Sequence, residues 1–206
     1  YRRKDSARTA LLAVILGGSS IGVSMTVKNL GVTLDETLSF NNHVDNVCRA
    51  SFFNIRALRH VRRYIDEDTA RIVAGSVVGA RLDYCNSIFY GTTAFNLARL
   101  QRILNALVRV VAGTRKRDHI TPVLASLHWL PVESRIKFKI ALLTFKAIKT
   151  NRPAYLAELL NFHITPRTLR SSSACRLQVS LVRTDFAGRA FCHAAASVWN
   201  NLPADL

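Results

Sequence analysis

Residues 94–113, AFNLARLQRILNALVRVVAG, decide the fold class of this chain. Apolar residues recur there at the three- and four-residue spacing of one helical face, namely Leu97, Leu100, Leu104, Leu107, Val108 and Val111. Arg102 and Arg109 fall on the other side of the same pattern, which ends at Gly113. We therefore predict a long amphipathic helix with one face in a core and one basic face.

The segments before this helix have the same period. A helix is predicted from Phe40 onward, in which Arg49, Arg56 and Arg63 follow one another at intervals of seven residues and Arg59 lies beside them. A second helix is predicted to begin at the acidic residues 66–68 and to run to about residue 90. The chain from residue 40 to residue 113 is thus expected to form a helical bundle.

The sequence after Gly113 predicts more helices and one strand. The helices are expected at residues 121–129, 131–150, 153–160 and 187–199, and the strand at residues 175–183. The helix at 131–150 carries apolar residues on two opposite faces, one with Ile136 and Ile140 and the other with Phe138 and Phe145. This arrangement predicts a helix that is covered on both sides.

The first 35 residues differ because they are rich in β-branched and small residues. Two short apolar runs, residues 10–16 and 21–27, flank Gly17 and Gly18 and predict a β-hairpin, and residues 27–35 predict a third strand. The expected fold is mainly α, of the α+β class: an N-terminal hairpin plus strand, a helical bundle, and a small strand and helix at the C-terminus. We expect three regions: an incomplete sheet at 1–36, the bundle at 37–113 and a second helical region at 114–206.

Composition narrows the classes of function. The 206 residues are 49% hydrophobic and 20% charged, which excludes intrinsic disorder as a description of the whole chain. Lys and Arg number 29 against 13 Asp and Glu, a formal net charge of +16. Such an excess predicts a polyanionic partner, and nucleic acid is the first candidate.

Other site types have little support in the sequence. The four cysteines form no CxxC pair, so neither a zinc module nor a disulfide framework is indicated. No apolar run reaches the ~18 residues of a transmembrane helix, and no membrane partner is expected. Basic residues before the run at 10–16 imitate a secretion signal, but the glycine pair interrupts that run. We expect a nuclear or cytoplasmic protein that is not secreted.

The candidate nucleic-acid-binding residues are basic side chains on the predicted helices and on one loop: Arg49, Arg56, Arg59, Arg63, Arg102, Arg109, Arg115, Lys116 and Arg117. Rows of this kind suit contacts to phosphates, which position a nucleic acid without specifying its sequence. The alternative is a solvated helix face, and residues 115–117 are also open to interpretation as a short nuclear localisation patch. Phe52 lies among the arginines as either a core residue or a stacking contact.

Several short motifs follow one another in an order that is more specific than any of them alone. They are VKNLGVTLD at 27–35, RLDYCN at 81–86, RKRDHITPVL at 115–124, SLHWLPV at 126–132 and WNNLP at 199–203. In this order the chain resembles the reverse transcriptases of LINE-type, non-LTR retrotransposons, in the portion after their catalytic palm motif. The resemblance covers most of the chain.

The resemblance implies a part of an RNA-directed DNA polymerase. Residues up to about Asp35 would complete the palm sheet, with Leu30 and Gly31 at a turn near the primer end, and the following helices would form the thumb that holds the template–primer duplex. The implied partners are an RNA–DNA hybrid and the N-terminal part of the polymerase. The family's palm holds two Mg²⁺ ions with carboxylates that include an adjacent Asp pair. This chain has no adjacent Asp pair, so we expect neither catalytic residues nor a cofactor in it, and Mg²⁺ only in the palm.

Two other hypotheses remain open. The chain could be a non-catalytic basic nucleic-acid-binding protein, or the remnant of a decayed element whose reading frame persists without polymerase activity. It could also be an exported helical protein, which would require cleavage near residues 17–24. N-terminal sequencing of expressed material would identify that last case.

Overall fold

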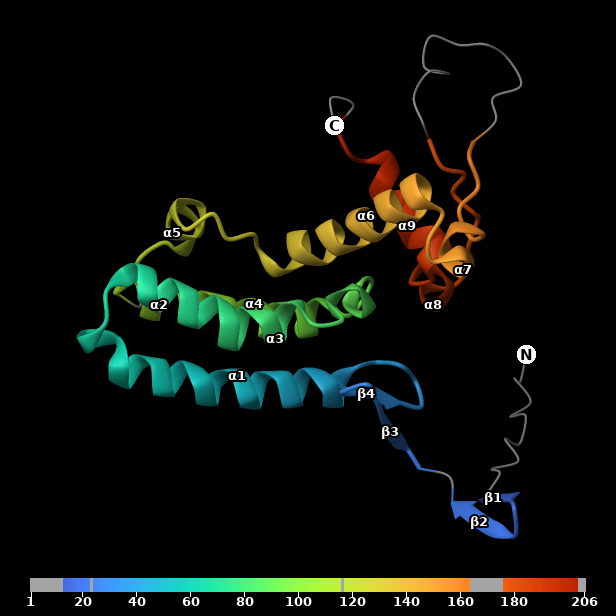
Figure 1. Cartoon of the computed structure of the whole chain (residues 1–206), viewed down its shortest axis with the longest axis horizontal. Coiled ribbons are helices and arrows are strands. Elements are labelled where there is room, and N and C mark those ends of the chain that lie inside the picture. The colour runs from blue at the N-terminus through green and yellow to red at the C-terminus, as the bar shows by residue number, and fades with distance from the viewer. Residues whose placement is uncertain (1–12, 23, 116, 164–175, 204–206) are drawn as a thin grey trace, which may run out of the picture. The chain divides into compact units, whose positions relative to one another are not determined.

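The computed structural model of the chain describes residues 13–22, 24–115, 117–163 and 176–203. Over these residues it is mainly helical, and all four of its strands lie in the N-terminal region (Figure 1), so the predicted α+β class is confirmed. The chain divides into two compact units, Tyr1–His43 and Val44–Leu206. The regions predicted at 1–36, 37–113 and 114–206 stay a prediction.

The N-terminal unit contains two β-hairpins. Strand β1 (Ala13–Leu16) pairs antiparallel with β2 (Ser19–Gly22), and β3 (Thr26–Asn29) pairs antiparallel with β4 (Val32–Asp35). Gly17 and Gly18 turn the first hairpin with φ values of 55° and 82°, as a two-residue turn between twisted strands requires. The first hairpin was predicted. Residues 10–12 of its expected first strand lie outside the described residues, and β2 begins and ends earlier than the predicted run at 21–27.

The single strand predicted at residues 27–35 is wrong, because the chain reverses at its centre. Leu30 and Gly31 have φ values of 44° and 83° and connect β3 to β4. Two consecutive positive φ angles suit a tight hairpin turn. A leucine seldom adopts positive φ, so Gly31 was the only one of the two residue types that indicated a turn. The turn at Leu30 and Gly31 that the resemblance implied is present.

The second unit is built from helices. They are α1 (Asn41–Val61), η1 (Arg62–Tyr64), α2 (Glu67–Ala74), a π turn η2 (Gly75–Gly79), α3 (Ala80–Asp83), η3 (Asn86–Phe89), α4 (Ala94–Ala112), α5 (Ile120–Ser126), α6 (Val132–Thr150), α7 (Ala154–Ala157), α8 (Asp185–Gly188) and α9 (Phe191–Asn200). The first residues of α1 belong to the N-terminal unit. All the predicted helices are present, with the second and the last divided into shorter pieces.

Helix α4 is the central helix of this unit because its apolar face is fully buried. Six residues on that face are at most 1% exposed: Leu100, Ile103, Leu104, Leu107, Val108 and Val111. The helix contacts α2, α5 and α6, and α6 in turn contacts α9. Thr93 caps the N-terminus through its hydroxyl, which accepts from the amide of Asn96, and Gly113 ends the helix with a φ of 65°.

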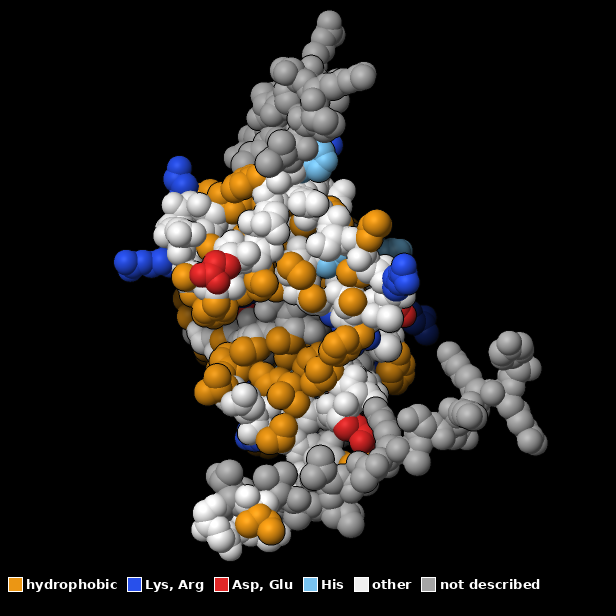
Figure 2. Space-filling view, turned by 90° about the vertical axis from the view of Figure 1, so that its right-hand side faces the viewer, with side chains coloured by type: hydrophobic (Ala, Val, Ile, Leu, Met, Phe, Trp, Pro, Cys, Tyr) orange, Lys and Arg blue, Asp and Glu red, His pale blue; other side chains and the backbone are white. Residues whose placement is uncertain are grey.

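Two expectations for the C-terminal region are wrong. The predicted strand at 175–183 is reduced, over its described residues, to one isolated bridge between Leu177 and Phe162. Helix α6 is covered on one face only, since Phe138 and Phe145 on the other face are 58% and 51% exposed. Figure 2 shows that hydrophobic side chains gather in broad patches on one face of the molecule.

Candidate nucleic-acid interface

Helices α1 and α4 run in the same direction (Figure 1), and two contacts join them. Near their N-terminal ends Arg99 of α4 forms an ion pair with Asp45 of α1. Just beyond the C-terminal end of α1, the Nε of Arg62 donates to the carbonyl oxygen of Val111 in α4 at 2.9 Å. These two contacts join the helices at both ends and define the seam between them.

Arg62 stabilises this arrangement in a second way. The last carbonyl groups of a helix have no partner within the helix, so the contact to Val111 satisfies one of them. The Nη1 of the same guanidinium donates to the carbonyl of Ile65 at 3.0 Å, at the turn between η1 and α2. Arg62 thereby connects the ends of α1 and α4 to the following turn.

A groove of 920 Å³ opens at this end of the seam. We call it the arginine groove; its lining residues are Arg59, Arg62, Arg63, Ala106, Arg109, Val110, Gly113 and Thr114. Four of these eight residues carry a permanent positive charge, while Ala106 and Val110 supply an apolar part of the lining. The arginines come from two segments far apart in the sequence, which the packing of α1 on α4 brings together.

The guanidinium groups of the groove keep hydrogen-bond donors available. None of the ion pairs found among the described residues includes Arg59, Arg62, Arg63 or Arg109. Arg109 donates from Nη2 to the carbonyl of Asp118 at 3.4 Å, whereas its buried Nε has no acceptor within the described structure. Phosphate oxygens are suitable acceptors for such groups.

An exposed aromatic ring lies next to the groove. The guanidinium of Arg63 is 4.7 Å from the ring centroid of Tyr64, which is 73% exposed. This cation–π contact orients the Arg63 side chain. It also places a flat surface, on which a base can stack, beside the positive charges.

The other predicted residues on the two helices lie outside the groove. Arg49 and Arg56 are exposed on α1, on the side opposite its buried residues, and Phe52 among them is 37% exposed. Arg102 is exposed on α4 and faces the seam near Cys48. Burial raises the pKa of the Cys48 thiol, while the charges of Arg99 and Arg102 act in the opposite direction. The predicted row on α1 is therefore on the surface, and only its C-terminal part reaches the groove.

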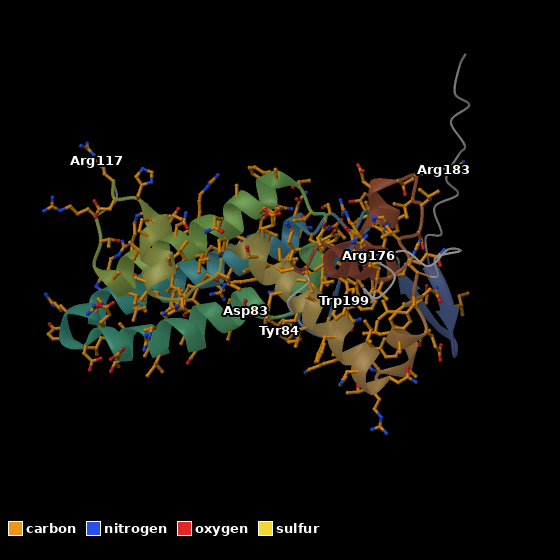
Figure 3. All side chains as sticks on the ribbon, turned by 90° about the horizontal axis from the view of Figure 1, so that it is seen from above. Asp83, Tyr84, Arg117, Arg176, Arg183 and Trp199 are labelled. Carbon is orange, nitrogen blue, oxygen red and sulfur yellow. The ribbon has the colours of Figure 1, made fainter. Side chains whose placement is uncertain are left out.

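The basic loop after α4 is held by Asp118. The carboxylate of Asp118 accepts from the backbone amide of Arg115 at 2.8 Å, which closes a tight turn. Arg115 and Arg117 are exposed, and Figure 3 shows Arg117 pointing away from the helices. Lys116 lies outside the described residues. The loop follows Thr114 in the chain, so it continues the positive charge of the groove.

Sequence reasoning missed Arg62 and Tyr64. Both lie in η1, after the regular helix ends, so a helical period of 3.6 residues does not place them correctly. The run VRRY at residues 61–64 was the available signal, since it combines two adjacent arginines with an aromatic residue. Both residues gain their role from their closeness to α4 in the fold, and the local sequence does not reveal which helix packs beside them.

Among the described residues, the acidic side chains form no magnesium site. Asp66 caps α2 by accepting from the amide of Thr69, and this hydrogen bond lowers the pKa of Asp66. Asp68 pairs with Arg71 at 3.0 Å. Over the described residues, no three His, Cys, Asp or Glu side chains are grouped so that they could hold a metal ion. The carboxylates present therefore do not fit the paired magnesium ions of a polymerase palm.

The turn of Leu30 and Gly31 belongs to the other unit. Both residues are exposed, Leu30 by 83%. The turn is therefore accessible in the hairpin of β3 and β4.

No protein-family model, curated protein or solved structure matches this chain. In the part of the chain that the structure describes, no helix combines the length and the apolar character needed to cross a membrane.

Proposed function

We propose that the helical unit binds the phosphate backbone of a nucleic-acid duplex through the arginine groove. The observation that carries the proposal is the convergence of four arginines from η1, α1 and α4 on one groove, without a carboxylate partner among the described ion pairs. The exposed residues Arg49 and Arg56 of α1, and Arg115 and Arg117 of the following loop, add further positive charge. Contacts of this type fix the position of a duplex without reading its sequence.

The order of motifs at 27–35, 81–86, 115–124, 126–132 and 199–203 supports a more specific role. In this proposal the chain is the C-terminal part of an RNA-directed DNA polymerase of a non-LTR retrotransposon, and the duplex is the template–primer hybrid. Arg59, Arg62, Arg63 and Arg109 contact phosphates, and Tyr64 provides a stacking surface. Catalysis belongs to the palm, which would hold Mg²⁺.

The test is the salt dependence of binding to an RNA–DNA hybrid, measured by fluorescence anisotropy. Each phosphate neutralised by a protein cation contributes about 0.9 to the log–log slope for duplex DNA. The double variant Arg59→Gln/Arg63→Gln is expected to lower this slope by about 1.8 and to weaken binding. Arg62 is left intact because it also holds α1 to α4.

The double variant Arg71→Gln/Lys137→Gln is the matched control. It removes the same charge from exposed residues that pair with Asp68 and Glu133 and do not line the groove. It should retain nearly the wild-type slope. Equal losses in both double variants would mean that only net charge matters and would refute the groove as the binding site.

A second candidate is a non-catalytic nucleic-acid-binding protein or the remnant of a decayed element. Asp66 caps α2 and Asp68 pairs with Arg71, so both carboxylates already have structural partners. This favours a chain that does no metal-dependent chemistry itself. The DNA upstream of the codon for Tyr1 discriminates between the two. An open frame that encodes a paired-Asp motif supports the polymerase, and a stop codon or an intron boundary supports the remnant.

A further inference from the structure

A second, smaller cavity lies where α3 and η3 meet α6. Its volume is 230 Å³, and it shares no lining residue with the arginine groove. Figure 3 shows Asp83 beside α6, where its Oδ2 accepts from the Nη1 of Arg135 at 2.8 Å. The lining residues are Asp83, Asn86, His128, Leu130, Arg135, Phe138 and Lys139. We call this site the Asn86 cavity.

One wall of the cavity is polar and held in place. Arg135 donates from Nε to the carbonyl of Leu130 at 2.9 Å in addition to its ion pair with Asp83. Asn86 is only 3% exposed, and its Nδ2 makes a long contact of 3.5 Å to Asp83. The Oδ1 of Asn86 has no hydrogen-bond donor within the described structure.

An acceptor left without a donor in a buried amide destabilises the free protein. Rotation about the last torsion of an asparagine side chain is soft. A small rotation can therefore turn Oδ1 of Asn86 toward a donor that enters the cavity. The cavity thus has an acceptor available for a ligand N–H group.

The other wall is apolar and open. Phe138 and Leu130 are 58% and 47% exposed, although both are large hydrophobic residues. Lys139 is half-buried beside them, one residue after Phe138 on α6. The cavity therefore combines an aromatic ring surface with hydrogen-bonding groups of both kinds.

The lining carries little net charge. Asp83 and Arg135 neutralise each other in their ion pair, which leaves the positive charge of Lys139. A neutral planar ring with N–H donors and acceptors along its edge matches the apolar surface and both sets of polar groups. The volume is below the ~300–1,000 Å³ of pockets for drug-sized ligands, so it suits one ring system.

We propose that the Asn86 cavity binds a single unpaired nucleobase, which stacks on Phe138 and donates an N–H group to Asn86 or Asp83. The inference rests on the proposed function for the source of the base, since a bound nucleic acid would present one at a strand end or a mismatch. Base recognition on the hydrogen-bonding edge, combined with stacking, is the usual means of reading unpaired nucleotides.

The first test uses 2-aminopurine riboside, a neutral nucleoside whose fluorescence falls when its ring stacks. Because the probe has no phosphate, its binding does not depend on the arginine groove, and the result stands even if duplex binding fails. The wild-type chain is expected to quench the probe in a saturable way that changes little with salt. Phe138→Ala should abolish the quenching.

Phe145→Ala is the matched control, because Phe145 is exposed to a similar degree on the same face of α6 but does not line the cavity. It should quench as the wild type does. Neither exposed phenylalanine supports the core, so both variants are expected to fold. Absence of quenching by the wild type, or equal quenching by Phe138→Ala, would overturn the proposal.

The second test uses a hybrid duplex with a one-nucleotide overhang and the same duplex with an abasic overhang. Stacking of one base on an aromatic side chain contributes about 1–3 kcal/mol, which corresponds to at least about fivefold in affinity. The wild type should prefer the overhang that carries a base by that factor. The preference should vanish in Phe138→Ala, while affinity for a blunt duplex stays unchanged; a preference that persists would refute the cavity as its source.

Discussion

At the scale of single residues, Asp35 organises the connection between β4 and α1. Its carboxylate accepts from the backbone amides of Thr37, Ser39 and Phe40 and from the hydroxyls of Thr37 and Ser39, at distances of 2.8–3.2 Å. Burial alone would raise the pKa of Asp35, but these hydrogen bonds favour the charged form and lower the pKa to about 2. One side chain thus fixes the loop from which α1 begins.

This pKa predicts how the N-terminal unit responds to acid. The folded pKa of about 2 lies below the ordinary value of 3.8, so the stabilisation by Asp35 is complete above pH 3.8 and is lost as the pH falls through 2. Protonation removes at most roughly 2 kcal/mol, and less after screening by solvent. NMR titration of the Ser39 and Phe40 amides should show a midpoint near pH 2.

The control for this titration is Asp35→Asn, which keeps the size of the side chain and removes its charge. The transition near pH 2 should be absent from the Ser39 and Phe40 amides of this variant. A wild-type midpoint close to 3.8 would contradict the hydrogen-bonding arrangement.

At the scale of elements, α4 is predicted to lose stability when its N-terminal cap is removed. The hydroxyl of Thr93 accepts from the amide of Asn96 at 3.3 Å. Thr93→Ala should lower the free energy of unfolding by about 1 kcal/mol, measured by denaturant titration. Thr93→Ser retains the hydroxyl and should stay close to the wild type. Equal losses in both variants would show that the methyl group, and not the cap, is responsible.

The sequence predicted α4 well because all its signals are local. The apolar period and Gly113 lie within one continuous stretch, and the structure confirms the helix at residues 94–112. The strand pattern missed the hairpin of β3 and β4, because Leu30, at the turn, is a residue type that rarely has positive φ; only the resemblance implied a turn at Leu30 and Gly31. The missing cover on Phe138 and Phe145 also escaped prediction, because an apolar face does not reveal which element packs on it.

The candidate site was predicted only in part for the same reason. Arg59, Arg63 and Arg109 were selected from helical periodicity, and all three line the arginine groove. Their meeting depends on the parallel packing of α1 and α4, which no local pattern specifies. The Asn86 cavity was not anticipated, since Asp83 and Arg135 are far apart in the sequence and come together only in the fold.

At the scale of the whole molecule, the net charge of +16 is a source of repulsion within the folded chain. Added salt should screen this repulsion, so the midpoint of thermal unfolding should rise between roughly 20 mM and roughly 300 mM NaCl. The rise should be about 2–4 °C for each kcal/mol gained. Differential scanning fluorimetry without nucleic acid measures it.

The double variant Arg49→Gln/Arg56→Gln serves as the comparison, because it removes two exposed charges from α1 without touching the arginine groove. It should unfold at a higher temperature in low salt and respond less to added salt. If the unfolding midpoint of the wild-type chain does not change with salt, charge repulsion does not destabilise the free protein and the prediction is wrong.

The contacts that hold Arg62 and Arg63 in place affect how selectively the arginine groove can bind an anion. Its guanidinium is already immobilised by Val111 and Ile65, and that of Arg63 rests on Tyr64 before any ligand arrives. Fewer side-chain rotamers are then lost when an anion docks than on a surface of freely rotating lysines. In the proposed binding of nucleic acid, the arginine groove is therefore preorganised, and its fixed geometry would favour polyanions whose charge spacing matches it.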